Sequence, residues 1–190
     1  TKIIMKKLVL SLALTLGIGS MLFAQSNAYQ FTDDVVVPHT SVKNQAKSGT
    51  CWCFAGLGMV EAEILRKYNT ELDLSEMHLV RWAYANKFEK YVRMQGTCNF
   101  SPGGEVFDVL YAINENGMMP NEAYEGLVLG ENVHNHGELH TVLAEYGKIV
   151  NKQPNGKISK VWDEMVQEIL NVYLGETPAT FTFEGTEYDA

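Results

Sequence analysis

Apolar residues recur at steps of three and four along much of this chain, which is the spacing of an amphipathic helix. From Trp52 to about Tyr68 the apolar and small residues fall on one face, and most of the charged residues fall elsewhere. The same spacing predicts further helices over residues 75–88, 105–116, 137–146 and 160–174. Residues 91–104 read as a loop, and only 179–183 alternate like a strand. The pattern therefore predicts a mainly helical fold with the start of a sheet near its end.

Several polar residues and glycines mark where these helices begin and end. Ser75 can cap the second helix, and Asn69-Thr70 closes the first. Asn116-Gly117 closes the third with a residue suited to a left-handed C-cap. Ser48-Gly49-Thr50 supplies a flexible loop and a hydroxyl that can cap the helix starting near residue 51.

The first 24 residues have the pattern of a secretory signal peptide. Met5-Lys6-Lys7 precedes an apolar run over residues 8–19, and small residues follow up to Ala24. A membrane anchor is the alternative, but this run contains two glycines and is short for a hydrocarbon core of ~30 Å. We expect a folded part over residues 25–190 and an exported protein, periplasmic or secreted, of bacterial type.

Charge and cysteine content narrow the possible partners. The formal charge is −8, and removing residues 1–24 takes away three lysines and no acidic residue, which gives −11. Nucleic acid is therefore not expected as a partner, because phosphate binding needs clustered Lys and Arg. Three cysteines are an odd number for an exported protein, so at least one thiol should be free. A pair between Cys53 and Cys98 stays open, and no Cys-x-x-Cys motif predicts structural zinc.

The segment from Val42 to Gly56 carries the candidate chemistry. A thiol at Cys51 would sit at a helix N-terminus, where unpaired N–H groups and the helix dipole stabilise a thiolate. The N–H of Cys51 and the side-chain amide of Gln45 could together bind the oxygen of a tetrahedral intermediate. Trp52 would bury its ring and help to fix the helix. The alternative is a buried structural thiol with an unrelated glutamine upstream, but the whole arrangement favours a nucleophile.

This segment, Gln45-x5-Cys51-Trp52-x-Phe54-Ala55, resembles the active-site segment of the papain-like cysteine peptidases. Three more segments resemble the family in its own order: 74–80 its second conserved helix, 101–104 its Gly-Gly loop and 116–124 a further conserved stretch. Secreted members usually carry a bonded cysteine pair where this chain has Ser48 and Ser101. In lacking this cysteine pair the chain resembles the bleomycin hydrolase/aminopeptidase C group, although that group is mostly cytoplasmic.

The resemblance implies an α+β papain-like fold, of which this chain would hold mainly the helical, nucleophile-bearing domain. It implies peptide hydrolysis, of aminopeptidase type, through an acyl-enzyme on Cys51, with Gln45 in the oxyanion hole. Gly103, Gly104 and Trp52 would bind the peptide substrate. No cofactor or metal is implied, and the full-length protein could be a homo-oligomer.

The resemblance also calls for a histidine base and an asparagine about 130–150 residues after the cysteine. That window opens near residue 181, whereas the five histidines are His39, His78, His134, His136 and His140. We therefore expect the His- and Asn-bearing half to be missing and the chain as given to be an inactive fragment. The alternatives are a complete protein without its base, a secreted relative that binds peptides without cutting them, and a papain-type endopeptidase with an open cleft.

The motif His134-Asn135-His136-x3-His140 raises the question of a metal site, because closely spaced imidazoles can gather around a transition metal. The plainer interpretation is a polar loop followed by a helix with exposed imidazoles. No cysteine or paired carboxylate completes the set, so we expect no metal.

Overall fold

The computed structural model describes residues 29, 31–153 and 157–190. The predicted signal peptide, residues 1–24, lies outside the described residues. The chain divides into two units, one up to Val36 and one from Val37 onwards. In the first unit, Tyr29 and residues 31–36 lie outside helices and strands. Among the described residues no helix is both long and apolar enough to cross a membrane.

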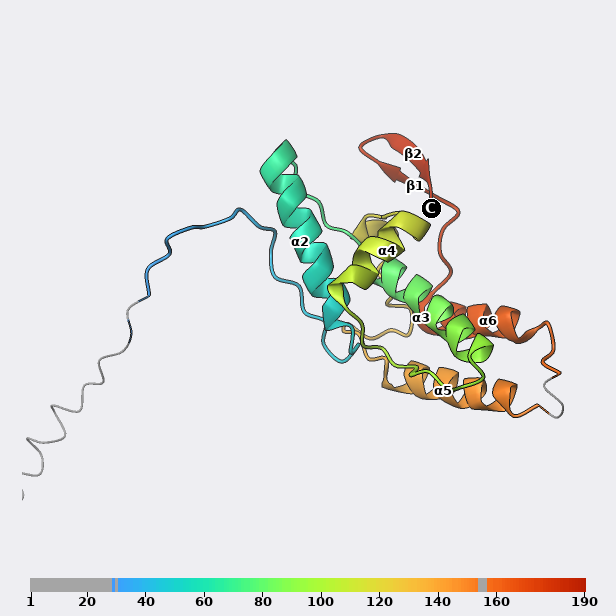
Figure 1. Cartoon of the computed structure of the whole chain (residues 1–190). Coiled ribbons are helices and arrows are strands. Elements are labelled where there is room, and N and C mark those ends of the chain that lie inside the picture. Colours follow the sequence, from blue (N-terminus) through green and yellow to red (C-terminus); the bar gives the residue numbers. More distant parts are fainter. Residues whose placement is uncertain (1–28, 30, 154–156) are drawn as a thin grey trace, which may run out of the picture. The chain divides into compact units, whose positions relative to one another are not determined.

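The second unit contains five described α-helices followed by a β-hairpin (Figure 1). The helices are α2 (Cys51–Tyr68), α3 (Glu76–Arg93), α4 (Val106–Asn116), α5 (Gly137–Asn151) and α6 (Trp162–Leu174). A short 3-10 helix, η1 (Asn121–Ala123), lies between α4 and α5. Strands β1 (Thr180–Phe183) and β2 (Thr186–Asp189) pair antiparallel. The predicted mainly helical α+β fold is confirmed.

Helix α3 lies at the centre of this arrangement and packs against each of the other four helices (Figure 1). Each helix contributes a fully buried side chain to one core: Leu57, Phe88, Val109, Leu143 and Leu170. Helices α2 and α4 approach closely at Gly56, where a Cβ would lie 2.5 Å from a methyl carbon of Val109. Helix α3 therefore links the α2–α4 pair to the α5–α6 pair.

The predicted helix boundaries are partly confirmed. The N–H of His78 donates to the Ser75 hydroxyl at 3.0 Å, and Asn69 ends α2 with a left-handed φ of 54°. Helices α3 and α5 both run five residues further than the sequence predicted, because Val92 and Val150 are still buried in the core. Strand β2 was not predicted.

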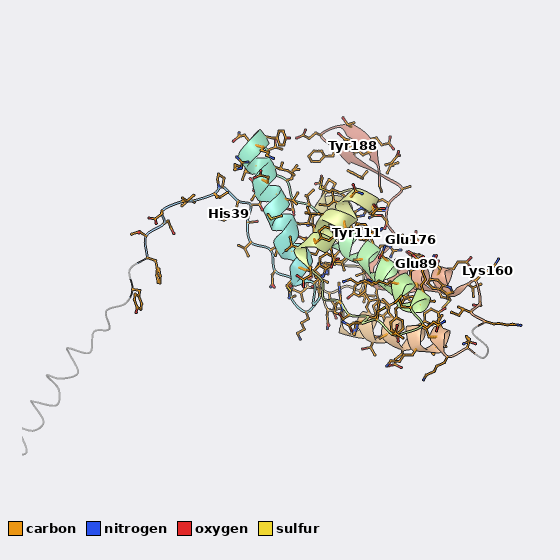
Figure 2. The ribbon with its side chains drawn as sticks, in the orientation of Figure 1. His39, Glu89, Tyr111, Lys160, Glu176 and Tyr188 are labelled. Atoms are coloured by element: carbon orange, nitrogen blue, oxygen red, sulfur yellow. The ribbon has the colours of Figure 1, made fainter. Side chains whose placement is uncertain are left out.

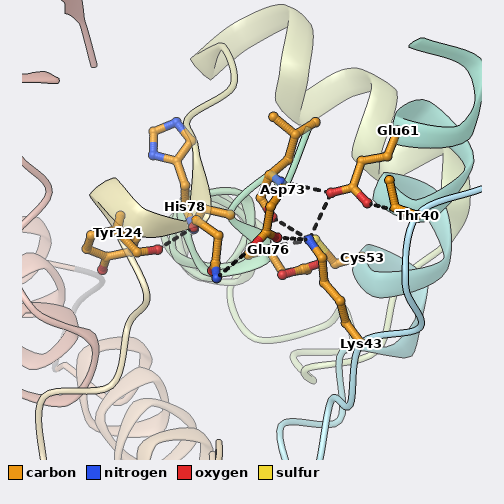
Figure 3. A network of polar contacts seen from close by, with 11 residues as sticks. Thr40, Lys43, Cys53, Glu61, Asp73, Glu76, His78 and Tyr124 are labelled. Carbon is orange, nitrogen blue, oxygen red and sulfur yellow. Dashed lines mark hydrogen bonds and ion pairs between the residues drawn. The ribbon is translucent and has the colours of Figure 1, made fainter. Parts of the chain in front are cut away.

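A partly buried charge cluster joins the start of the second unit to α2 and α3 (Figure 3). The ammonium of Lys43 lies 2.8 Å from a Glu61 carboxylate oxygen, 2.7 Å from Asp73 and 3.0 Å from Glu76. It also donates to the backbone oxygen of Leu74 at 2.9 Å. One cation thus holds three acidic residues from different parts of the chain.

Glu61 is the most enclosed member of this cluster, with 1% of its surface exposed. One of its oxygens accepts the Thr40 hydroxyl at 2.7 Å, and the other accepts the N–H of Leu74 at 2.8 Å. A buried carboxylate is tolerated only where its oxygens are hydrogen-bonded and its charge is paired. The contacts around Glu61 meet both conditions.

The pKa values in the cluster are consistent with this pairing. Burial alone would lower the pKa of Lys43, but its bonds to Asp73 and Glu61 and the charge of Glu76 hold that pKa above its ordinary value. Burial raises the pKa of Glu76, and Lys43 opposes this rise. Removing the ammonium would leave buried carboxylates without a counter-charge.

We predict that Lys43→Met destabilises the protein by about 3–5 kcal/mol, the usual cost of removing one partner from a buried ion pair. Lys67→Met is the matched control, because Lys67 lies on the surface of α2 and pairs with the exposed Glu63; its loss should leave the free energy of unfolding almost unchanged. Urea unfolding of the full-length protein measures both. Equal midpoints for the two variants would contradict the prediction.

Candidate active site

Cys51 is the first residue of α2 and its side chain is exposed. The backbone oxygen of Thr50 accepts the N–H groups of Cys53 at 2.9 Å and Phe54 at 3.4 Å. Within the described part of the chain, the N–H groups of Cys51 and Trp52 donate to no acceptor. Open N–H groups at the positive end of a helix dipole stabilise a thiolate or an oxyanion. The placement matches the one that the sequence predicted for a nucleophile.

The loop before α2 is held by hydroxyl groups, but not by the predicted helix cap. Thr50 occupies the N-cap position, and its side chain makes no capping hydrogen bond. Its φ of −113° and ψ of 37° differ from the extended conformation that lets a cap side chain reach back to the helix. Instead the hydroxyls of Ser48 and Thr50, both buried, lie 2.7 Å apart. The predicted hydroxyl cap was therefore wrong, and both hydroxyls stabilise the loop itself.

Gln45 and Cys51 line the same hollow, which has a volume of about 430 Å³. Between them the chain turns back through positive φ angles at Ala46 (49°) and Gly49 (71°). The N–H of Ser48 donates to the Gln45 backbone oxygen at 3.1 Å. No hydrogen bond within the described residues occupies the Gln45 side-chain amide, and its Oε1 atom is buried without a partner there. The structure thus brings Gln45 and Cys51 together, while their chemical roles stay predictions.

A distant segment pairs with this loop. The N–H of Lys47 donates to the His134 backbone oxygen at 2.9 Å, and the N–H of His136 donates to the Lys47 oxygen at 3.2 Å. These bonds form a parallel bridge between Lys47 and Asn135. The histidine motif therefore serves as a backbone support for the loop that carries Gln45, a role that the sequence did not reveal.

The Gly-Gly loop lies against the start of α2. Trp52 is 4% exposed, and its indole N–H donates to the Pro102 oxygen at 2.9 Å. A Cβ on Gly104 would lie 2.9 Å from a Trp52 ring carbon and 2.7 Å from an Asp108 carboxylate oxygen, so only glycine fits there. Gly103 is exposed. The Trp52 ring supports this loop from inside, and its predicted contact with substrate stays a prediction, as do those of Gly103 and Gly104.

Within the described residues, no histidine is hydrogen-bonded to Cys51. The His78 ring is buried on α3 and contacts the backbone oxygen of Asn116 at 3.1 Å, and burial lowers its pKa. The His140 ring contacts the Phe100 oxygen at 3.3 Å and stacks on the Phe100 ring. His39 lies on the segment that leads into α2 and lines the hollow beside Cys51, with its Nδ1 atom 2.8 Å from the Thr40 oxygen (Figure 2).

The rings of His134 and His136 lie next to each other, and the His136 ring is buried. Burial lowers the pKa of His136 to about 4, and the neighbouring His134 lowers it further in the same direction. Burial lowers the pKa of His134 as well. In the described part of the chain, no group of three His, Cys, Asp or Glu side chains is placed to hold a metal ion. The three-histidine metal site that the sequence raised is not formed, because the His140 ring contacts Phe100 instead.

All three cysteines are free thiols, so the Cys53–Cys98 pair that the sequence left open is not formed. Cys53 is fully buried, and burial raises the pKa of its thiol. Cys98 is partly exposed, and Cys51 is exposed at a helix N-terminus. Of the three, Cys51 has the surroundings of a reactive thiol.

Comparison with known proteins agrees with this arrangement. The sequence model described as "Papain family cysteine protease" matches residues 30–186. "Peptidase 1" of Psoroptes ovis is 35% identical over 85 residues, which cover 45% of this chain and 22% of that protein. "Bleomycin hydrolase" of Rattus norvegicus is 25% identical over 187 residues, which cover 81% of this chain and 40% of that protein.

Among solved structures, pepw from Lactobacillus rhamnosis superposes with a TM-score of 0.56 at 20% identity. The superposition covers 83% of this chain and 42% of that one, and it confirms the predicted fold. The predicted resemblance to the bleomycin hydrolase group is confirmed too. The chain spans less than half the length of each of these relatives.

We predict that His136 makes the protein less stable as the pH falls. A histidine whose folded pKa is about 4, against 6.5 when unfolded, binds its proton more readily in the unfolded state. As the pH drops from 6.5 to about 4, the free energy of unfolding should decrease by about 3 kcal/mol in total. His136→Phe keeps a ring against Tyr84 and should weaken this dependence.

The measurement is the free energy of urea unfolding at pH 4.5 and pH 7 for the full-length protein. His39→Gln is the control, because it removes an imidazole from the surface rather than from the core. The same pH dependence in His136→Phe and in the unsubstituted protein would show that His136 is not the source.

Proposed function

This chain belongs to the papain family of cysteine proteases, and from that premise we propose that Cys51 is the nucleophile of an aminopeptidase of the bleomycin hydrolase type. The observation that carries the proposal is the exposed thiol at the start of α2, beside open N–H groups and the Gln45 side chain. The match to bleomycin hydrolase, which extends over most of the chain, and the serines at positions 48 and 101 support this branch of the family.

The reaction follows from the chemistry of these groups. The Cys51 thiolate attacks the carbonyl carbon of the peptide bond, and the electron pair of the carbonyl moves onto its oxygen. The N–H of Cys51 and the amide of Gln45 stabilise that oxyanion. Collapse of the intermediate breaks the C–N bond, and the leaving amine takes a proton from an imidazolium. Water then hydrolyses the thioester and restores the thiolate.

The imidazole and its orienting asparagine come, in this proposal, from residues outside this chain. Its span of 40% of bleomycin hydrolase leaves room for them in a longer protein. Three of the described histidines are engaged with other parts of the helical domain, which also favours an outside base: His78, His136 and His140. A chain without the base would not turn over peptides, because nothing would protonate the leaving amine.

Aminopeptidase specificity is tested with matched peptides. Full-length protein should release the first residue of a peptide with a free amino group, and acetylation of that group should suppress cleavage. Cleavage within both peptides would favour an open-cleft endopeptidase, and binding of either without cleavage would favour a non-catalytic relative. Export, as the first 24 residues predict, is tested by fractionating the producing bacterium.

We predict that a chloromethyl ketone peptide labels Cys51 ahead of Cys53 and Cys98 in the full-length protein. Cys53 is buried with a raised thiol pKa, so it should react last. Peptide mapping identifies the labelled residue. Cys51→Ala should abolish turnover, while Cys98→Ser, the control at a partly exposed thiol, should leave it intact. Turnover that survives Cys51→Ala would refute the assignment.

We predict that Gln45→Ala lowers kcat by about 10²-fold with little change in KM, the usual consequence of losing one oxyanion donor. Steady-state kinetics on the full-length protein measures both constants. Asn44→Ala is the neighbouring control, because the Asn44 side chain accepts only the N–H of Ala46 among the described residues. Equal losses of kcat in the two variants would mean that the loop fold, rather than the Gln45 amide, is responsible.

A further inference from the structure

Two successive carbonyl groups of the Gly-Gly loop accept hydrogen bonds from side chains of α2 and α3. The indole N–H of Trp52 donates to the Pro102 oxygen at 2.9 Å. The ammonium of Lys87, on α3, donates to the Gly103 oxygen at 2.6 Å. The loop therefore depends on contacts from two different helices, and the second is a short bond from a charged donor.

The Lys87 side chain is held in place by neighbouring groups. Its side chain is partly buried, and its ammonium lies 5.0 Å from the centre of the Trp52 ring, a distance suited to a cation–π contact. Burial lowers the pKa of Lys87, and the nearby Asp108 opposes this effect. Asp108 also accepts the N–H of Glu105 at 2.9 Å, which secures the chain just after the glycines.

The direction of one carbonyl fixes the direction of the next N–H group. A trans peptide is planar, so its C=O and N–H point to opposite sides. With the Gly103 oxygen turned toward Lys87, the N–H of Gly104 points away from α3, and it meets no acceptor among the described residues. We propose that Lys87 is a positioning residue that turns the Gly103–Gly104 peptide so that the Gly104 N–H is presented to the backbone of a bound peptide. This inference rests on the proposed function.

The sequence explains why such a contact matters at this loop. Two consecutive glycines have wide conformational freedom, so the peptide between them can rotate at little steric cost. Because positions 48 and 101 are serines, no disulfide can join this loop to the loop before α2. The bond from Lys87 restricts a peptide that its own residues leave loose.

A second role for Lys87 would leave a different kinetic signature. If its charge acted on the Cys51 thiolate, its loss would slow every reaction of that thiol. If it orients the Gly104 N–H, its loss affects ligands that lie along the loop and spares a small reagent that reacts with the thiol alone. Iodoacetamide is such a reagent, since it has no peptide backbone to align.

The experiment uses the full-length protein with Lys87→Met, Lys87→Arg and the control Lys90→Met, which removes an exposed lysine from the same helix. We expect Lys87→Met to raise KM for a peptide substrate by about tenfold, the effect of losing one hydrogen bond from a charged donor. The rate of Cys51 alkylation by iodoacetamide should stay within about twofold of that of the unsubstituted protein. Lys87→Arg should recover part of the lost affinity, and Lys90→Met should change neither quantity.

An unchanged KM in Lys87→Met, or alkylation that slows in parallel with turnover, would overturn the proposal. Thermal unfolding shows whether Lys87→Met folds. If it does not, Lys87→Gln, which keeps a neutral donor of similar length, replaces it, and a KM equal to that of Lys87→Arg would count against the role of the charge. Absence of turnover in the unsubstituted protein would instead refute the proposed function itself.

Discussion

The pairing of the Lys43 ammonium with Glu61, Asp73 and Glu76 is the interaction on which the rest of this structure depends. Two of these carboxylates are almost fully enclosed, and burying them is tolerable only while the cation stays in place. The cluster joins the segment before α2 to α2 itself and to the start of α3. Because Gln45 follows Lys43 by two residues, the same charge pairing that stabilises the fold also fixes where the candidate oxyanion loop begins.

From that anchor the site is assembled by hydrogen bonds between distant segments rather than by covalent links. Pairing of Lys47 with the 134–136 segment supports the loop before α2, and contacts from Trp52 and Lys87 support the Gly-Gly loop. Each contact joins elements distant in sequence, so the geometry around Cys51 depends on the packing of the whole helical domain. Small changes far from the thiol can therefore alter the alignment of a bound peptide.

The sequence predicted what local physics decides. The start of α2 at Cys51, the capping role of Ser75 and the end at Asn69 follow from helix periodicity and cap chemistry, and all are present. Long-range contacts were beyond such patterns. Nothing local distinguishes Lys87 from Lys90, yet only the first reaches the Gly-Gly loop. The hydroxyl of Thr50 failed as a cap because Ser48, which also lies in that loop, offered a buried partner.

The histidines show how burial divides roles within the domain. An imidazole that acts as a base needs access to the nucleophile and a pKa near the working pH. His136 lacks both, since its ring is enclosed beside Tyr84 and its pKa is lowered to about 4. Its backbone, in contrast, bonds to the loop that carries Gln45. A buried neutral histidine suits that structural use, because it can pack like an aromatic ring without introducing a charge. The helical domain thus holds the exposed thiol, and in the proposed function it also supplies the oxyanion donors and the peptide-binding edge. The proposed proton transfer then calls for an imidazole that approaches Cys51 from its exposed side.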